Sequence, residues 1–432
     1  MTENYLCKKS DLYRVFVGER ELDVFKEATC DFVLIRTESF VDLKIFTTNE
    51  IETIDIRPTR RKKEFNIIDK NSLSVKVNCG EYLSLEVNSD LERPLLIFAD
   101  EPKTVSAFDG YNLMYFEKDT FYETGIITPQ SNTVIFIDEG AVVDGAIFAQ
   151  EVENVRVLGN GIIKRVDDSK YRKYPVCFEK SKNIEVSGIT IIGKHNWNLR
   201  MLFCENFVIE NVKILAHEIW SDGIDMISCK NALVRHVFVK NEDDCICIKS
   251  YGEDAAELGN PDVYNILVED CVLWSGPRGN SLEIGYETNL STISNVSYRN
   301  IDVIHRQTQE NKFHRAVISI HNAGSSVVKN ITYENIFAEH SDENLFYIAH
   351  MYHPSWGTGG GVIENIAIRN FSLTGGEIPP SILNAYPKDD DLKCVINNLC
   401  FENLVIHGEK VTENNFEQMN FQVKGVENLK FL

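Results

Sequence analysis

The sequence predicts an all-β protein, a right-handed parallel β-helix preceded by a small N-terminal β-sandwich domain. Three observations lead to this fold class: a repeat that covers most of the chain, strand-like alternation within each copy, and a first segment that lacks the repeat. No stretch shows sustained helical spacing, which disfavours a helical repeat. We therefore expect a β-sandwich domain over residues 1–100 and a β-helix domain over residues 101–432.

The first 100 residues are predicted to form short strands. Segments rich in Val, Ile, Leu and Phe cover residues 12–17, 30–35, 43–46 and 83–87. Several short strands without a helical pattern are typical of a β-sandwich. We expect this domain to end near residues 93–98 and the first coils of the β-helix to follow near residues 133–137 and 141–147.

Each copy of the repeat begins with an Asn, continues with alternating apolar residues and often carries a second Asn, or an equivalent residue, five positions later. One copy cannot bury its own apolar face, but stacked coils bury a continuous core with neighbouring strands about 4.8 Å apart. Asn tolerates the left-handed backbone of a corner, so we expect the Asn residues to stack and to hydrogen-bond from coil to coil. The nine copies begin at Asn154, Asn183, Asn206, Asn231, Asn265, Asn295, Asn330, Asn365 and Asn398. Residues after about 410 should close the open end of the core.

The charge of the chain excludes several partners. It has 44 Lys and Arg against 65 Asp and Glu, a formal charge of −21. Nucleic acids and anionic membranes require concentrated Lys and Arg, so neither is an expected partner. The first residues lack the basic-then-apolar order of a secretory signal, which predicts a cytoplasmic protein, or a secreted one if a signal was removed. The eleven cysteines are expected to be mostly buried, reduced thiols.

Two acidic clusters fall on successive copies of the repeat, at Trp220–Asp225 and Asn241–Lys249. Asp222 and Asp243 are 21 residues apart, about one coil, so their carboxylates should lie on the same face with Asp244 beside them. Like charges held this close raise at least one pKa, which lets one carboxyl serve as general acid beside an ionised general base. Glycoside hydrolysis needs such a pair.

On these residues the chain resembles the polygalacturonase-like glycoside hydrolases, the pectinase clan that includes polygalacturonases and the related dextranase and isopullulanase type. That group carries Asn-Thr-Asp-Gly and, one coil later, Asp-Asp-Cys or Asp-Asp-Ala. This chain has Ser-Asp-Gly at residues 221–223 and Asp-Asp-Cys at residues 243–245, and the resemblance covers roughly residues 105–340. It implies that the β-helix is catalytic, that Asp243 protonates the glycosidic oxygen, that Asp222 and Asp244 orient and deprotonate the attacking water, and that the reaction inverts configuration.

The chain departs from the polygalacturonase pattern at two places. Asn280 stands where polygalacturonases carry the His of Gly-His-Gly, and the Arg-Ile-Lys that grips the uronate carboxylate is absent, the nearest segment being His314–His321. Together with the negative charge of the chain, these departures favour a neutral glycan over a galacturonide as the oligosaccharide or polysaccharide substrate. No HExxH segment and no spaced set of Cys and His occurs, so neither a metal nor a cofactor is expected.

Further substrate-binding candidates share the face of the acids, or are aromatic side chains on which sugar rings stack. They are Trp197, Arg200, Trp220, Asp225, Lys249, Asn280, Glu283, Tyr286, Arg315, His321 and Trp356.

Two other functions remain open. In a non-catalytic carbohydrate-binding β-helix, the acids would only hydrogen-bond sugars. A polysaccharide lyase or epimerase shares the fold, but lyases usually need Lys, Arg or calcium against a uronate, and Lys249 is the only basic residue adjacent to the acids in the sequence. The sequence carries no feature that specifies an oligomeric state.

Overall fold

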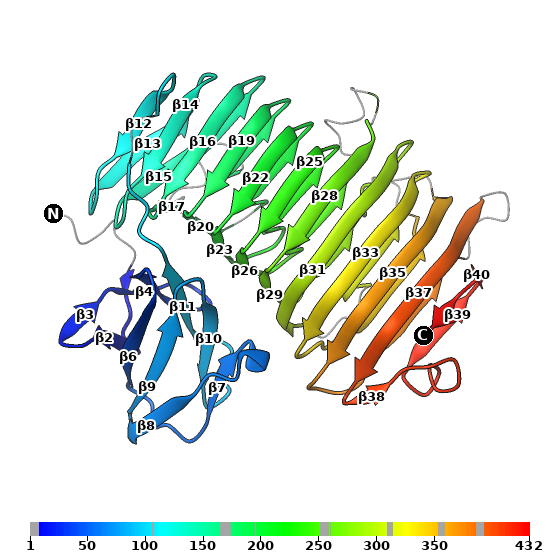
Figure 1. Ribbon diagram of the computed structural model, residues 1–432, viewed down its shortest axis with the longest axis horizontal. Coiled ribbons are helices and arrows are strands. Elements are labelled where there is room, and N and C mark those ends of the chain that lie inside the picture. Colours follow the sequence, from blue (N-terminus) through cyan, green and yellow to red (C-terminus); the bar gives the residue numbers. More distant parts are fainter. Residues whose placement is uncertain are drawn as a thin grey trace.

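The computed structural model describes residues 8–105, 108–164, 174–194, 196–250, 259, 261–308, 314–352, 359–385 and 393–432. Two parts follow each other along the chain, a pair of small N-terminal sheets and a long stack of parallel strands (Figure 1). The described residues include one short helix, the 3-10 turn η1 (Thr59–Arg61). None of the helical structure in this part of the chain is long and apolar enough to cross a membrane.

The N-terminal part consists of two sheets that pack face to face. Alternate residues of both sheets, among them Val15, Leu73, Val33 and Leu85, form one buried apolar cluster. This arrangement is the predicted β-sandwich. The first sheet has the order β1 (Lys8–Lys9), β4 (Val24–Lys26), β5 (Asp31–Arg36), β11 (Leu95–Asp100), β10 (Tyr82–Val87) and β7 (Ile54–Arg57). The second has the order β3 (Arg20–Leu22), β2 (Tyr13–Val17), β6 (Phe40–Thr47), β9 (Ser72–Asn78) and β8 (Phe65–Asp69).

The remaining strands form a parallel β-helix, in which three series of strands pair coil upon coil. The first series comprises β12 (Asn112–Phe116), β14 (Thr133–Ile137), β16 (Glu153–Gly159), β19 (Lys182–Ser187), β22 (Glu205–Glu210), β25 (Lys230–Arg235), β28 (Val263–Glu269), β31 (Thr292–Arg306), β33 (Val327–Ala338), β35 (Gly361–Leu373) and β37 (Cys394–Ile406). The second comprises β13 (Phe121–Ile127), β15 (Val142–Gln150), β17 (Ile162–Lys164), β20 (Thr190–Gly193), β23 (Lys213–Ala216), β26 (Phe238–Asn241) and β29 (Val272–Ser275), and continues in the later halves of the long strands.

The third series follows the second within each coil. It comprises β18 (Val176–Glu179), β21 (Leu199–Leu202), β24 (Ile224–Ile227), β27 (Ile246–Lys249), β30 (Leu282–Ile284), β32 (Ala316–Asn322), β34 (Asn344–His350), β36 (Ser381–Asn384) and β39 (Phe421–Lys424). Three short strands, β38 (Glu409–Lys410), β40 (Val426–Glu427) and β41 (Lys430–Phe431), pair with β37. Met419, Phe421 and Phe431 join the core cluster there, so the last residues cover the end of the core as expected.

The repeated Asn residues form the predicted ladder. All nine adopt left-handed backbone with φ between 54° and 59°. Seven of them donate a side-chain hydrogen bond to the Asn one coil earlier, for example Asn365 to Asn330 at 3.2 Å and Asn398 to Asn365 at 2.7 Å. A second ladder joins Asn300, Asn335, Asn370 and Asn403, at the position five residues later. The repeat therefore marks the corners at which every coil turns.

Replacing Asn330 with Ala should lower the free energy of unfolding by about 3 kcal/mol. Left-handed backbone costs Ala, which lacks the local hydrogen bonding of Asn, roughly 1–2 kcal/mol, and the two lost ladder hydrogen bonds cost roughly 0.5–1 kcal/mol each. Asn330→Gly keeps the backbone conformation and removes only the ladder bonds, so its loss should be smaller. Urea unfolding of both variants measures the two effects. Equal losses in Ala and Gly would contradict a backbone contribution.

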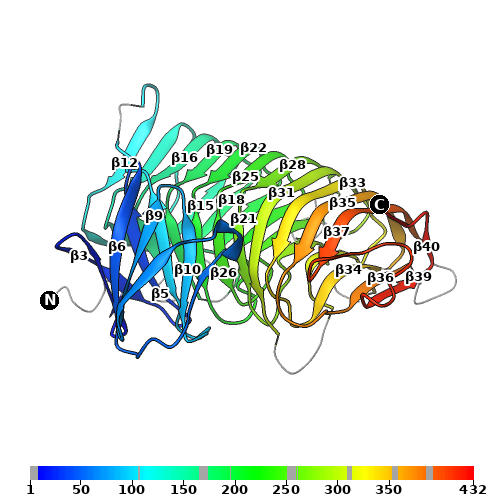
Figure 2. The same ribbon diagram turned by 60° about the horizontal axis from the view of Figure 1, so that its bottom comes forward.

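The β-sandwich docks onto the second series of β-helix strands (Figure 2). Phe32, Tyr82 and Phe98 of the sandwich share one buried cluster with Leu215 and Phe238 of the β-helix. Ion pairs flank this apolar contact. Arg57 pairs with Glu339 at 2.6 Å and Lys213 with Asp100 at 2.8 Å, and Arg60 also pairs with Asp302. Nε2 of His305 also lies within hydrogen-bond distance of Glu86, at 2.8 Å. The sandwich thus covers the second series from Val142 to Ile304.

Candidate active site

The outward residues of the third series form one row across six coils. Apolar residues such as Leu199, Met201, Ile224 and Met226 point into the core, so the residues between them point outward. The strand register aligns these outward residues in the order Arg200, Asp225, Cys247, Glu283, Ser319 and Tyr347. We call this surface the site face.

The three predicted acids meet where the second series turns into the third. One carboxylate oxygen from each of Asp222, Asp243 and Asp244 lies within 4.8 Å of the other two, and in the described part of the chain no other three His, Cys, Asp or Glu side chains come so close. Two glycines permit this approach. A Cβ at Gly223 would lie 2.4 Å from the carbonyl oxygen of Cys245, and one at Gly279 would lie 1.7 Å from the carbonyl carbon of Asp243. The turn that carries Asp243 and Asp244 is therefore sandwiched between two close coils.

Burial and mutual repulsion raise the pKa values of these acids. Burial, reinforced by the Asp244 carboxylate, raises the pKa of Asp243 to about 8, against the opposing effect of Arg315. Burial and then the charge of Asp225 hold the pKa of Asp222 well above its usual range. Burial also raises the pKa of Asp225 to about 6, although Lys249 opposes the shift. Such a set retains protons near neutral pH, as a general acid requires.

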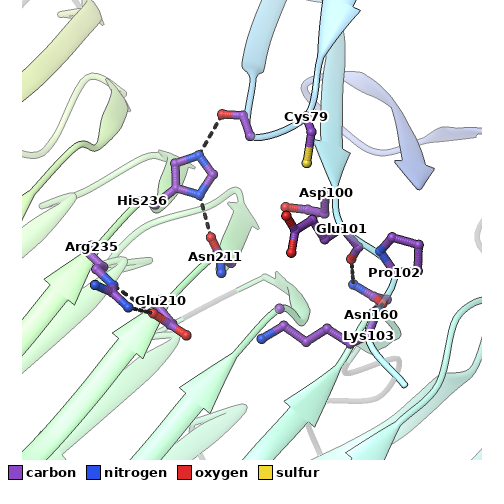
Figure 3. A pocket seen from close by; sticks show the side chains of 12 residues that line it. Cys79, Asp100, Glu101, Pro102, Lys103, Asn160, Glu210, Asn211, Arg235 and His236 are labelled. Carbon is purple, nitrogen blue, oxygen red and sulfur yellow. Dashed lines mark hydrogen bonds and ion pairs between the residues drawn. The ribbon is translucent and has the colours of Figure 1, made fainter. Parts of the chain in front are cut away.

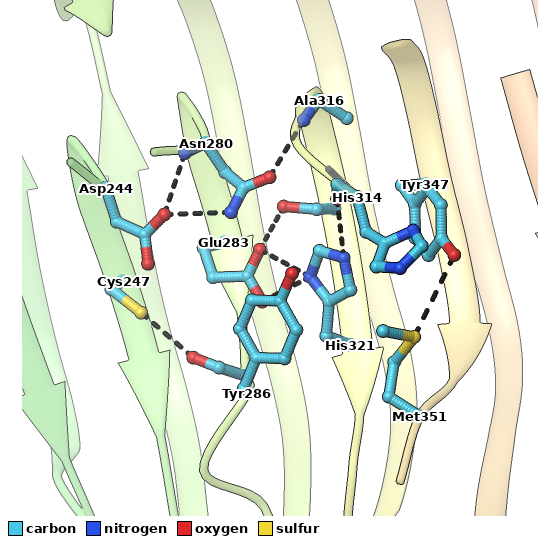
Figure 4. Close-up of polar contacts among 12 residues, drawn as sticks. Asp244, Cys247, Asn280, Glu283, Tyr286, His314, Ala316, His321, Tyr347 and Met351 are labelled. Carbon is cyan, nitrogen blue, oxygen red and sulfur yellow. Dashed lines mark hydrogen bonds and ion pairs between the residues drawn. The ribbon is translucent and has the colours of Figure 1, made fainter. Parts of the chain in front are cut away.

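Asn280 binds Asp244 instead of facing outward (Figure 4). It is 1% exposed, and its backbone N and side-chain Nδ2 donate to the same oxygen of Asp244, at 2.7 and 2.8 Å. Its Oδ1 accepts from the backbone N of Ala316 at 2.8 Å. Hydrogen bonds of this kind are strongest to an ionised acceptor. The geometry therefore indicates that Asn280 orients Asp244, where substrate contact was predicted.

Glu283 and His321 form a buried pair beside this cluster (Figure 4). Nδ1 of His321 lies 2.9 Å from both carboxylate oxygens of Glu283, and Nε2 lies 2.7 Å from the carbonyl oxygen of His314. Since a carbonyl only accepts, Nε2 carries a hydrogen, and the pair shares one further proton. Its net charge is then zero whichever partner holds that proton. Tyr286 and Tyr347 stack on the two sides of the imidazole, at 4.1 and 4.9 Å.

Lys249 lies at the centre of a second cluster. Its Nζ is 3.3 Å from Asp222, 3.1 Å from Asp225 and 3.5 Å from Glu287, and its side chain is only 4% exposed. The same Nζ lies 4.1 Å from the centre of the Trp197 ring. Lys249 thus contacts protein groups on several sides, where a contact with substrate was predicted.

The remaining predicted residues fall into different environments. Arg200 is buried and pairs with Glu179 at 2.8 Å, which makes it part of the wall of the site face. Arg315 is half-buried, donates to the carbonyl oxygen of Arg278 and acts electrostatically on Asp243. Trp220 is 56% exposed, so its ring is accessible to a sugar. Trp356 lies outside the described residues.

A hollow lies elsewhere, between the two domains (Figure 3). This cavity of about 620 Å³ is lined by residues such as Asp100, Lys103, Asn160, Glu210 and His236, and by none of the three clustered acids. Several of its charged groups already have protein partners: Arg235 pairs with Glu210 at 2.6 Å (Figure 3), and Asp100 pairs with Lys213 at 2.8 Å. We therefore assign it to the docking interface and not to the candidate active site.

Sequence reasoning missed several residues of the site face. Ser319 donates to Glu283, Tyr347 stacks on His321, and Tyr174 stacks on Trp197 at 5.9 Å. Ser319 and Tyr347 could have been found by aligning the inward apolar residues of each coil, because the positions between them must point outward. Tyr174 precedes its strand and has no such signal.

Fold and carboxylates together define the class, a parallel β-helix with the clustered acids that glycoside hydrolysis requires. The family model of Glycosyl hydrolases family 28 matches residues 103–423, and the chain belongs to this family. The probable rhamnogalacturonase A of Aspergillus oryzae is 27% identical over 195 residues, which are 44% of this chain and 37% of that protein. The probable exopolygalacturonase B of Neosartorya fischeri is 24% identical over 219 residues, 45% of each chain.

Solved structures of several other proteins share the fold. Dex49A from Penicillium minioluteum superposes with a TM-score of 0.65 at 14% identity, covering 97% of this chain and 93% of that one. An exopolygalacturonase from Thermotoga maritima gives a TM-score of 0.54 at 18% identity, covering 74% and 84%. The chain spans less than half the length of the curated relatives it matches, from 16% to 49%.

Proposed function

We propose that the protein hydrolyses O-glycosidic bonds of an oligosaccharide or polysaccharide by acid–base catalysis. The observation that carries this proposal is the meeting of Asp222, Asp243 and Asp244 within 4.8 Å at the turn that leads into the site face. Asp243, whose pKa is raised to about 8 by burial and by Asp244, holds the proton for the glycosidic oxygen. Asp244, which accepts two hydrogen bonds from Asn280, takes the proton of a water that Asp222 orients.

The proposed stereochemical outcome is inversion. Carboxyl groups of inverting enzymes are commonly about 6.5–9.5 Å apart, whereas those of retaining enzymes are about 5–5.5 Å apart. The 4.8 Å spacing alone would favour retention. Three carboxylates meet here, however, so Asp222 and Asp244 can hold a water together while Asp243 acts as the acid. This third carboxylate is the reason for proposing inversion.

The proposed substrate is a neutral glycan, which brings no uronate carboxylate to the site face. Among the residues that the structure describes, the cations that act on the three acids are Lys249 and Arg315. Lys249 pairs with three carboxylates, and Arg315 is bound to a backbone carbonyl and faces Asp243. The Glu283–His321 pair adds no net charge. A uronate carboxylate would therefore meet an excess of negative charge, whereas neutral hydroxyls meet hydrogen-bond acceptors. A galacturonide, which the names of the curated relatives suggest, is the alternative.

The test uses an α-1,4-oligogalacturonide, its carboxyl-reduced counterpart and a set of neutral glucan oligosaccharides. The wild type should release reducing ends from a neutral member, and proton NMR should show the inverted anomer first. Absorbance of an unsaturated uronate would indicate a lyase. Binding without release of product would indicate a carbohydrate-binding protein. Faster cleavage of the galacturonide than of its reduced form would contradict the neutral substrate.

A further inference from the structure

Lys249 and its partners come from four consecutive coils. Trp197 precedes β21, Asp222 and Asp225 belong to the coil of β24, Lys249 ends β27, and Glu287 follows β30. The ammonium group joins them all, with its Nζ 3.1–3.5 Å from three carboxylates and 4.1 Å from the indole ring. In the described part of the chain, Lys249 is the only basic residue that forms an ion pair with Asp222 or Asp225.

The other charged and titratable groups around these acids face elsewhere or add negative charge. Arg200, the register neighbour of Asp225 on β21, pairs with Glu179. On the opposite side of Asp225 lies the buried thiol of Cys247 on β27. The remaining neighbours are the acids Asp243 and Asp244, Arg315 beside Asp243, and the Glu283–His321 pair on the next coil.

We propose that Lys249 is a positioning residue, shared between Asp222 and Asp225 on one side and Glu287 on the other, and that this sharing sets the pH range in which the carboxylate cluster works. The inference rests on the proposed function, because it concerns the same acids. It assigns Glu287 an opposite role to that of Lys249: Glu287 draws the ammonium away from the acids and limits its effect on them.

The physical basis is the excess of buried negative charge. Burial acts to lower the pKa of Lys249, but Asp225 and the neighbouring groups outweigh it, so this pKa lies well above the ordinary value and the ammonium stays charged. The ammonium in turn opposes the rise in the pKa values of Asp222 and Asp225 that burial causes. An opposite charge within about 4–6 Å lowers a carboxyl pKa by roughly 1–3 units. The acids ionise as a coupled set, so the acidic limb of the pH–rate profile reports the set.

The experiment compares Lys249→Met with Glu287→Gln in the full chain. Lys249→Met removes the ammonium that stabilises the ionised carboxylates. The acidic limb of the kcat/KM profile should therefore move to higher pH, by about one pH unit or more. Without Glu287, Lys249 acts more fully on Asp222 and Asp225, so the limb should move to lower pH. Lys249→Arg keeps the charge and should shift the limb less than Lys249→Met.

The matched control is Lys240→Met. Lys240 is also buried, and its Nζ lies 4.2 Å from the centre of the Trp274 ring, but it belongs to β26 on the docked side. This variant should leave the pH profile unchanged. Thermal unfolding at each pH shows which variants fold. If Lys249→Met does not fold, Glu287→Gln still tests the inference independently.

Two results would overturn the role of Lys249: limbs that move in the same direction in Lys249→Met and Glu287→Gln, or a limb that stays fixed in Glu287→Gln. If the inference about Lys249 fails but Asp243→Asn is inactive in the same assays, the proposed function still stands. If Asp243→Asn keeps wild-type activity, the proposed function itself fails, and the inference fails with it.

Discussion

Asp243→Asn should lower kcat/KM for a glycan substrate by about 10³-fold, within the range of 10²–10⁴ that general acid–base catalysis contributes. The amide matches the carboxyl in shape but has no acidic proton for the leaving oxygen. Because burial and Asp244 raise the pKa of Asp243 to about 8, the wild type should also lose activity as the pH rises through 8, when this proton is lost. The measurement is the initial rate of reducing-end release between pH 4 and pH 10.

A glycosyl fluoride separates acid catalysis from a structural effect, because fluoride leaves without protonation. Asp243→Asn should retain most of its activity on this substrate if Asp243 is the acid. Glu242→Gln is the matched control: Glu242 is the preceding acid, but its charged neighbours are Lys240, Arg278 and Glu92, away from the carboxylate cluster. Equal losses on both substrates would argue against the proposed role.

Asp100→Asn should lower the free energy of unfolding by about 3 kcal/mol or more, since removing one partner of a buried ion pair leaves an uncompensated charge. Asp100 contacts Lys213 at 2.8 Å, Arg36 at 3.2 Å and the hydroxyl of Tyr82 at 2.6 Å, all of them buried or nearly so. Thermal and urea unfolding measure the loss, and limited proteolysis shows whether the sandwich detaches from the β-helix.

The pH dependence of that loss has a definite sign. Burial lowers the pKa of Lys213 to about 8, although Asp100 opposes the shift. Loss of Asp100 lowers this pKa further, so the buried lysine of the variant becomes neutral at a lower pH than that of the wild type, and above about pH 8 both lysines are neutral. The defect should therefore shrink with rising pH. Glu139→Gln, which removes the exposed pair with Lys118, is the control and should cost less than about 1 kcal/mol. A loss of that size in Asp100→Asn would contradict the prediction.

The β-helix was predictable because its cause repeats in the sequence. Each coil needs an Asn in left-handed backbone, and Asn330, Asn365 and Asn398 occur where that need arises. The docking of the sandwich was not predictable in this way. Arg57 and Glu339 are 282 residues apart and have no periodic counterpart. A single long-range ion pair leaves no pattern in one sequence, whereas a stacked corner does.

For the candidate site, the sequence predicted which acids meet but not what surrounds them. The 21-residue interval between Asp222 and Asp243 is a backbone property, so the pattern of coils is enough to bring them together. Whether Asn280 and Lys249 face a sugar or a neighbouring carboxylate depends on side-chain directions and on close approaches such as that at Gly279. Spacing alone does not carry that information.

The docked sandwich also has a consequence for how this protein can evolve. A solenoid normally gains or loses a coil at little cost, because each coil contacts only its neighbours. Here the β-sandwich binds the β-helix at two distant points. Arg36 donates to the carbonyl of Asn160 at 2.8 Å, and Arg57 binds Glu339. Inserting or deleting one coil between Asn160 and Glu339 would displace one contact point by about 4.8 Å relative to the other. The sandwich thus restricts the number of coils between these two contact points, a stretch that includes the acids. Insertions and deletions of coils should therefore occur only outside this stretch.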